Sequence, residues 1–141
     1  MRRPPRLVLD TNILISAILW GGKPGELLAL AGEGEVRLYT SRVLLDELRA
    51  VLERPKLARA LQATGLSIVD ILADYRRLTT LARPAPLAKP LSRDPDDDHV
   101  IACALAAAAD FLVTGDDDLL TLEEVQPVAI RSVSAFLREL S

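Results

Sequence analysis

The sequence is poor in cysteine, histidine and aromatic residues. Cys103 is the one cysteine, so an internal disulfide is excluded, and its apolar, alanine-rich neighbourhood predicts a small buried hydrophobe instead of a nucleophile. His99 is the one histidine and no Gly-x-Ser-x-Gly elbow is present, which disfavours a Ser-His-Asp hydrolase. The few aromatic residues form no aromatic-rich strand motif, so a stacking platform for single-stranded nucleic acid is not expected.

Long apolar runs are also missing. The basic segment at residues 1–6 is not followed by an apolar stretch long enough for a signal peptide or a membrane span, and we therefore expect a cytoplasmic protein. Hydrophobic residues make up 50% of the chain and charged residues 26%, a balance that predicts a folded globule. With 141 residues and no internal repeat, the chain is expected to form one domain over residues 1–141.

Acidic residues are concentrated in the last third of the chain. Residues 1–93 carry a net charge of +6, whereas residues 94–141 carry −9. Seven of the 20 acidic residues lie in two short clusters, at residues 94–98 and 116–118. Two carboxylates ~4 Å apart repel by roughly 4 kcal/mol at an effective dielectric constant of 20, so their convergence would require a cation or protonation. Two solvated acidic turns are the alternative interpretation.

The hydrophobic pattern predicts strands that alternate with helices. Apolar or alternating runs predict strands near residues 6–9, 36–40, 111–114 and 128–130. Helical spacing predicts helices near residues 24–31, 41–53, 56–63, 68–81, 99–109 and from 132 onward, with Ser41 and Ser132 as expected caps. Residues 12–19 form a further apolar segment after the first strand. This order predicts an α/β fold, a three-layer α/β/α sandwich whose central parallel sheet has about four to five strands.

Four acidic residues from separate segments are expected at one edge of this sheet. Asp10 and Asp116 follow predicted strands. Asp98 directly precedes the predicted helix at residues 99–109, and Glu47 lies in the helix after the second strand. Because ligands bind outside the carboxyl ends of parallel strands, all four carboxylates can meet there. Each also has a simpler interpretation: a turn for Asp10, a surface position for Glu47 and a helix cap for Asp98.

Four short motifs follow one another along nearly the whole chain. They are Leu-Val-Leu-Asp-Thr-Asn at residues 7–12, Leu-Asp-Glu-Leu at 45–48, Asp-Pro-Asp-Asp-Asp-His-Val-Ile-Ala at 94–102 and Val-Thr-Gly-Asp-Asp-Asp-Leu-Leu at 113–120. In this order and spacing they resemble the motifs of the PIN-domain family, particularly the toxin ribonucleases of bacterial and archaeal toxin–antitoxin pairs. Any one of the motifs is weak evidence, but the four together are specific.

The resemblance implies a metal-dependent endoribonuclease and assigns roles to particular residues. Asp10, Glu47, Asp98 and Asp116 would form the acidic quartet that binds one or two Mg²⁺ or Mn²⁺ ions. Asp118 would be an occasional fifth ligand, with Asn12 and Thr114 as supporting polar groups. The assignment of Asp98, instead of Asp96 or Asp97, depends on where the following helix begins. Basic side chains would then bind the RNA backbone around the acidic pocket, namely Arg42, Arg49, Arg54, Lys56 and Arg59.

The expected partners follow from the same hypothesis. RNA would be the substrate, and an antitoxin protein would be a partner if the chain is a toxin. A homodimer is expected because the apolar helices around residues 57–81 exceed what one small sheet can cover.

Other classes of protein fit the sequence less well. Asp94, Asp96 and Asp98 match the start of an EF-hand loop, but His99 replaces its glycine and Leu105 its final glutamate. An aspartyl-nucleophile phosphatase would need a different residue at Asn12. The main alternative is a non-catalytic PIN-like module that binds RNA or protein, and the intact acidic quartet argues against it.

Overall fold

The computed structural model describes residues 3–92 and 94–141, which fold around a six-stranded sheet. The strands are β1 (Arg6–Leu9), β2 (Arg37–Thr40), β3 (Thr79–Leu81), β4 (Phe111–Val113), β5 (Glu124–Val125) and β6 (Val128–Arg131). Their order in the sheet is β3-β2-β1-β4-β6-β5, and every neighbouring pair is parallel except β5 and β6. The predicted α/β fold is confirmed, with a mostly parallel sheet that has six strands instead of four or five.

Helices connect the strands. They are α1 (Thr11–Trp20), α2 (Gly22–Gly32), α3 (Arg42–Leu52), the 3₁₀ helix η1 (Pro55–Leu57), α4 (Ala58–Thr64), α5 (Ile68–Leu78), α6 (Pro95–Ala106), α7 (Asp117–Leu120) and α8 (Val133–Leu140). The predicted serine caps are confirmed: the Ser41 hydroxyl accepts the Leu44 N–H at 3.3 Å, and Ser132 accepts the Ala135 N–H at 3.1 Å. Such caps fix where α3 and α8 begin because they satisfy an N–H that has no partner within the helix.

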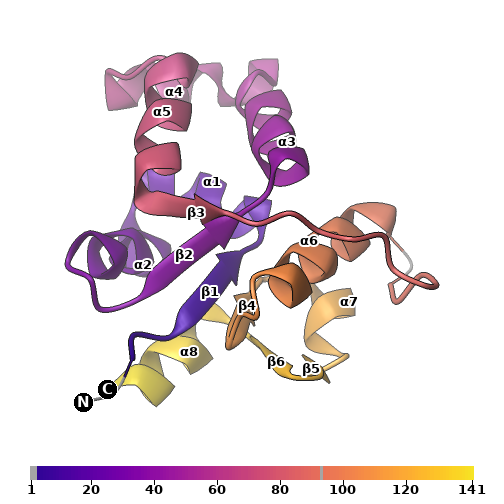
Figure 1. The fold of residues 1–141 in the computed structure, drawn as a ribbon. Helices are drawn as coiled ribbons and strands as arrows, with labels where there is room; N and C mark the ends of the chain where they lie inside the picture. Colours follow the sequence, from indigo (N-terminus) through magenta and orange to yellow (C-terminus); the bar gives the residue numbers. More distant parts are fainter. Residues whose placement is uncertain (1–2, 93) are drawn as a thin grey trace.

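The sheet separates two hydrophobic cores. Along β1, Leu7 and Leu9 pack on one face with α1, α2, α3, α5 and α8, whereas Val8 packs on the other with α6 and α7. This alternation follows from the two-residue period of a strand. Figure 1 shows the sheet between these helical layers, with α6 and α7 on the side away from α4 and α5. The three-layer arrangement agrees with the fold predicted from the sequence.

The point where the strand order reverses lies at β1. Its neighbours are β2, which follows it in the chain, and β4, which comes after α6. The chains leaving β1 and β4 therefore diverge to opposite faces of the sheet and leave a crevice between them, where ligands of open α/β sheets bind.

Several element boundaries differ from the sequence prediction. The helix predicted to reach residue 81 ends at Leu78 and continues directly as β3, and the two-residue strand β5 was not predicted. The apolar segment at residues 12–19 is the helix α1. The helix expected at 99–109 begins four residues earlier, at Pro95.

Among the described residues, no single helix is both long enough and apolar enough to cross a membrane. Helices α1 and α2 reach that length and composition only together, across a bend of 94°.

Candidate metal centre

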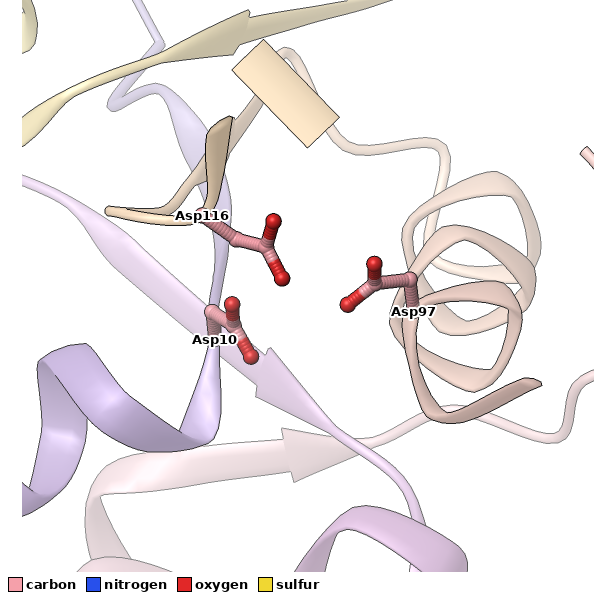
Figure 2. A group of neighbouring side chains, drawn as sticks. All are labelled: Asp10, Asp97 and Asp116. Carbon is pink, nitrogen blue, oxygen red and sulfur yellow. The ribbon is translucent and has the colours of Figure 1, made fainter. Parts of the chain in front are cut away.

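Three carboxylates converge at the reversal point of the sheet. Asp10, Asp97 and Asp116 each place one oxygen so that the three oxygens lie within 4.8 Å of one another. Asp10 follows β1, Asp116 follows β4, and Asp97 belongs to the first turn of α6. Figure 2 shows Asp10 and Asp116 side by side at the strand ends, with Asp97 facing them from the helix. Three segments that are distant in sequence thus build one acidic pocket.

Asp10 is held in place by its neighbours from β4. Its backbone N–H donates to the Val113 carbonyl at 2.9 Å, which continues the pairing of β1 and β4 beyond the strand ends. The hydroxyl of Thr114, a fully buried residue, donates to Asp10 Oδ2 at 2.7 Å. Burial raises the pKa of the Asp10 carboxyl above its usual range; the Thr114 hydrogen bond opposes this shift and the Asp116 carboxylate adds to it.

Asp116 is oriented by the same threonine and by the helix that follows. Its backbone N–H donates to the Thr114 hydroxyl oxygen at 3.0 Å, so Thr114 connects Asp10 with Asp116. Asp116 caps α7, because its Oδ1 accepts the Asp118 N–H at 2.8 Å. One carboxylate oxygen is thereby fixed, and the carboxylate faces the pocket (Figure 2).

Asp97 reaches the pocket because α6 begins at Pro95. Asp94 caps this helix by accepting the Asp96 N–H at 2.9 Å, and proline suits the first helical position. Asp97 is only 5% exposed, and its Oδ2 accepts a hydrogen bond from the Ser92 hydroxyl at 3.0 Å. Desolvation by burial, together with the Asp116 and Asp94 carboxylates, raises the pKa of Asp97 to about 6, against the opposing effect of Ser92.

Asp98 does not join the cluster, which corrects the sequence prediction. Its Oδ1 accepts the backbone N–H groups of Leu91 at 3.1 Å and of Ser92 at 2.9 Å. Consecutive helical residues point about 100° apart, so Asp97 and Asp98 cannot both face the strand ends. Asp98 is not the helix cap either, since that position belongs to Asp94.

The residue that sequence reasoning missed is therefore Asp97. Asp97 lies three, four and seven residues before Val100, Ile101 and Ala104, and all three of these are buried. This spacing places it on the buried face of α6. The Asp94-Pro95 pair, a capping residue followed by proline, is the signal that would have located the helix start.

Glu47 lies near the pocket but outside the group of three. It is half-buried on α3, and burial raises the pKa of its carboxyl, with the Asp96 and Asp10 carboxylates raising it further. Glu47 therefore lies within electrostatic range of the pocket, and its predicted role as a ligand stays a prediction. Within the described parts of the chain, the three carboxylates form the group with metal-binding spacing, and Glu47 is not in it.

The remaining predicted site residues have different environments. Thr114 is buried between Asp10 and Asp116, whereas Asn12 and Asp118 are exposed. The five basic candidates are all exposed, on α3 or in the segment from its end to α4. They are Arg42, Arg49, Arg54, Lys56 and Arg59. None of the ion pairs formed between described residues includes them.

Comparison with known proteins shows the family of this chain. A family model described as PIN domain matches residues 6–118, so the chain belongs to the PIN-domain family. A search among curated proteins gives no match. Among solved structures, the PIN domain of human SMG5 is similar, with 14% identity over 97% of this chain and 100% of that chain and a TM-score of 0.48.

Proposed function

We propose that this chain is a ribonuclease that uses Mg²⁺ or Mn²⁺, held by Asp10, Asp97 and Asp116, to hydrolyse RNA phosphodiester bonds. One observation carries the proposal: three carboxylates from three segments of a PIN domain place oxygens within 4.8 Å of one another at the reversal point of the sheet. Two of them, Asp10 and Asp97, are nearly buried. Buried like charges at this spacing are costly unless a cation or a proton neutralises them.

The donor set fits a hard divalent cation. Carboxylate oxygens are the ligands that Mg²⁺ and Mn²⁺ prefer, and Mg²⁺ is commonly held by one or two carboxylates with waters completing the shell. When bound, the ion would supply positive charge next to the attacked phosphate and activate a water nucleophile. Thr114 and Ser92 would keep two of the carboxylates aimed at the ion through their hydroxyl groups. Glu47 is the proposed fourth acid, because it lies on α3 within electrostatic range of the Asp10 carboxylate.

Basic residues would hold the substrate beside the acidic pocket. Arg42 and Arg49 lie on α3, the helix that also carries Glu47, and Arg54, Lys56 and Arg59 follow it in the chain. Their side chains are exposed and form no ion pair with described residues, so they are free to bind phosphates. Phosphate contacts of this kind position RNA without reading its sequence.

The test is cleavage of a generic single-stranded RNA by the purified chain with Mn²⁺, with Mg²⁺ and with EDTA. We expect cleavage with either ion and products that carry a 5′-phosphate and a 3′-hydroxyl. Chelation and the Asp10→Asn substitution should each abolish cleavage, whereas Asp70→Asn, a change at an exposed position on α5, should leave it intact. Full cleavage in EDTA, or by Asp10→Asn, would contradict the proposal. Binding of RNA without cleavage under any of these conditions would favour the non-catalytic module instead.

We also propose that the chain is the toxin of a toxin–antitoxin pair, a role supported by the resemblance of its four motifs. Coexpression with the protein encoded by the adjacent gene should suppress RNA cleavage and yield a stable complex. Growth arrest that the neighbouring gene does not relieve would count against an antitoxin.

A homodimer is the remaining proposal. Leu66 and Val69, in the region of α4 and α5, are 44% and 68% exposed, which supports an apolar contact surface there. Light scattering should return about twice the chain mass of 15.3 kDa at micromolar concentration, and a value near the chain mass would contradict dimerisation.

A further inference from the structure

The segment at residues 82–92, which connects β3 to α6, is hydrogen bonded to its surroundings at its two ends, while Leu87 in its middle packs against the core that contains α6. At one end the Ala82 N–H donates to the Thr40 carbonyl at 2.7 Å. Between there and residue 91 the segment makes no hydrogen bond with other described residues, partly because three of its residues are prolines, which lack an N–H. Figure 1 shows it as an extended segment without regular secondary structure, which runs from β3 past α6. A groove of about 470 Å³ is lined by residues of this segment, of α3 and of α6, among them Leu87, Val43 and His99.

The other end is held by Asp98. One oxygen of this carboxylate, Oδ1, accepts two consecutive backbone N–H groups, from Leu91 at 3.1 Å and from Ser92 at 2.9 Å. Hydrogen bonds to an ionised acceptor are roughly twice as strong as neutral ones. Asp98 sits in the first turn of α6 and so attaches the end of the segment to the helix.

Ser92 connects this end of the segment with the acidic pocket. Its hydroxyl oxygen accepts the Asp94 N–H at 3.4 Å, and its hydroxyl proton is donated to Asp97 Oδ2 at 3.0 Å. Because the hydroxyl accepts from one side, its proton is directed to the other, toward Asp97. The position of the Ser92 backbone, fixed by Asp98, therefore determines whether this hydrogen bond to Asp97 can form.

We propose that Asp98 is a positioning residue, which orients the Asp97 carboxylate through Ser92. This inference rests on the proposed function, because it concerns the orientation of a proposed metal ligand. Residues that orient ligands typically change metal affinity or activity by 10- to 100-fold when removed. Asp98 and Asp97 thus have different roles. Asp97 supplies a carboxylate oxygen to the pocket, and Asp98 fixes the Ser92 backbone, whose side chain orients that carboxylate.

The positioning role and a direct ligand role predict different effects of asparagine. An asparagine carbonyl can still accept the Leu91 and Ser92 N–H groups, so Asp98→Asn should keep Mn²⁺ affinity within about threefold of the wild type. Asp98→Ala removes the acceptor and should weaken Mn²⁺ binding by about 10- to 100-fold. If Asp98 were a ligand, Asp98→Asn would lose binding as completely as Asp10→Asn.

Ser92 provides an independent variant pair. Ser92→Ala should weaken Mn²⁺ binding to a similar extent as Asp98→Ala, while Ser92→Thr, which keeps a hydroxyl, should restore most of it. Because both residues act along one path, the double variant Ser92→Ala/Asp98→Ala should bind no more than about threefold more weakly than the weaker single variant. The control is Asp70→Ala, which removes an exposed charge on α5 and should leave affinity unchanged.

The experiment is calorimetric Mn²⁺ titration of the full chain and these variants, with circular dichroism to confirm folding and hydrogen exchange at the Ser92 amide. Asp98→Ala should speed that exchange and Asp98→Asn should not. If wild type binds Mn²⁺ and folded Asp98→Ala binds equally well, or if Asp98→Asn loses binding like Asp10→Asn, the positioning role is wrong while the proposed function stands. If Asp98→Ala does not fold, the Ser92→Ala and Ser92→Thr pair decides the question by the same criterion. A wild type that binds no Mn²⁺ at millimolar concentration overturns both.

Discussion

Each of the two acidic clusters contains one carboxylate that faces the pocket beside others that are exposed to solvent, and the comparison shows what distinguishes a site residue. Asp97 and Asp116 face the crevice between β1 and β4, whereas Asp96, Asp117 and Asp118 are exposed at the same helix starts. Local sequence is nearly identical for the two sets. The difference comes partly from Asp10, which lies in a distant segment of the chain. Thr114 donates to the Asp10 carboxylate and accepts the Asp116 backbone N–H, and the Ser92 hydroxyl donates to the Asp97 carboxylate. The density of acidic residues in the sequence thus indicates which segments contribute to the site. Which of these acids belong to it depends on the tertiary structure.

The largest expected contrast is in catalysis. Asp97→Asn should lower the Mn²⁺-dependent RNA cleavage rate by at least about 10³-fold, since a metal site supplies several kcal/mol of transition-state stabilisation. Asp117→Asn removes the same charge from an exposed position next to Asp116 and should change the rate less than about twofold. Initial rates at saturating Mn²⁺ measure both. Equal losses in the two variants would show that overall charge, instead of the pocket, controls activity.

The same two variants should also differ in stability without metal, where the variant with the larger loss of activity should be the more stable one. In EDTA at pH 7.5, Asp97→Asn should raise the free energy of unfolding by on the order of 1–2 kcal/mol, because it removes a desolvated charge that repels Asp116. Asp117→Asn, whose carboxylate is exposed, should leave stability nearly unchanged. Urea denaturation monitored by circular dichroism gives both values. A destabilised Asp97→Asn variant would mean that the pocket tolerates three charges without strain.

The raised pKa of Asp97 should also make the stability of the metal-free protein depend on pH. Since burial raises the pKa of Asp97 to about 6, the folded chain binds more protons than the unfolded chain between the unfolded aspartate pKa of about 3.9 and 6. The free energy of unfolding of the metal-free protein should therefore fall as pH rises through that window and then level off. The raised pKa of Asp10 acts in the same direction. The difference between wild type and Asp97→Asn across pH 4 to 7 isolates this contribution, and a flat difference would refute it.

The smallest expected effect concerns the basic surface. Arg49→Ala and Lys56→Ala should each weaken RNA binding by only a few fold, about evenly across RNA sequences, and each should reduce the salt dependence of binding by about one phosphate contact. Arg77→Ala, on the exposed end of α5 in an ion pair with Asp74, is the control. Fluorescence anisotropy at several salt concentrations measures both the RNA affinity and its salt dependence. An unchanged salt dependence in Arg49→Ala and Lys56→Ala would mean that RNA binds to another surface.

Much of the fold was predictable because it depends on local pattern. The run at Arg6–Leu9 is apolar and ends in Asp10, and Ser41 and Ser132 cap the helices that they were expected to cap. The strands β3 and β5 have three and two residues, and they form because β2 and β6 are available as partners. Pairing of that kind is set by tertiary context and is not encoded in the propensities of so few residues.

The candidate site was predictable in part for a related reason. Asp10 and Asp116 could be placed because each lies shortly after the end of a strand. Asp97 was missed because the alanine-rich run after Asp98 suggested a later helix start than the Asp94-Pro95 pair sets. The contact from Asp98 to Leu91 and Ser92 depends on where the extended segment at residues 82–92 meets α6. That position cannot be predicted from the hydrophobic periodicity of the sequence.

The central claim is that Asp10, Asp97 and Asp116 jointly hold one divalent site, and thermal unfolding with and without Mn²⁺ tests it most directly. A ligand present at 100 times its dissociation constant stabilises the folded state by ~2.7 kcal/mol, so wild type should melt at a clearly higher temperature in Mn²⁺ than in EDTA. Asp10→Asn, Asp97→Asn and Asp116→Asn should each lose most of that shift, while Asp117→Asn should retain it. A shift of the same size in all four variants, or none in wild type, would contradict the account.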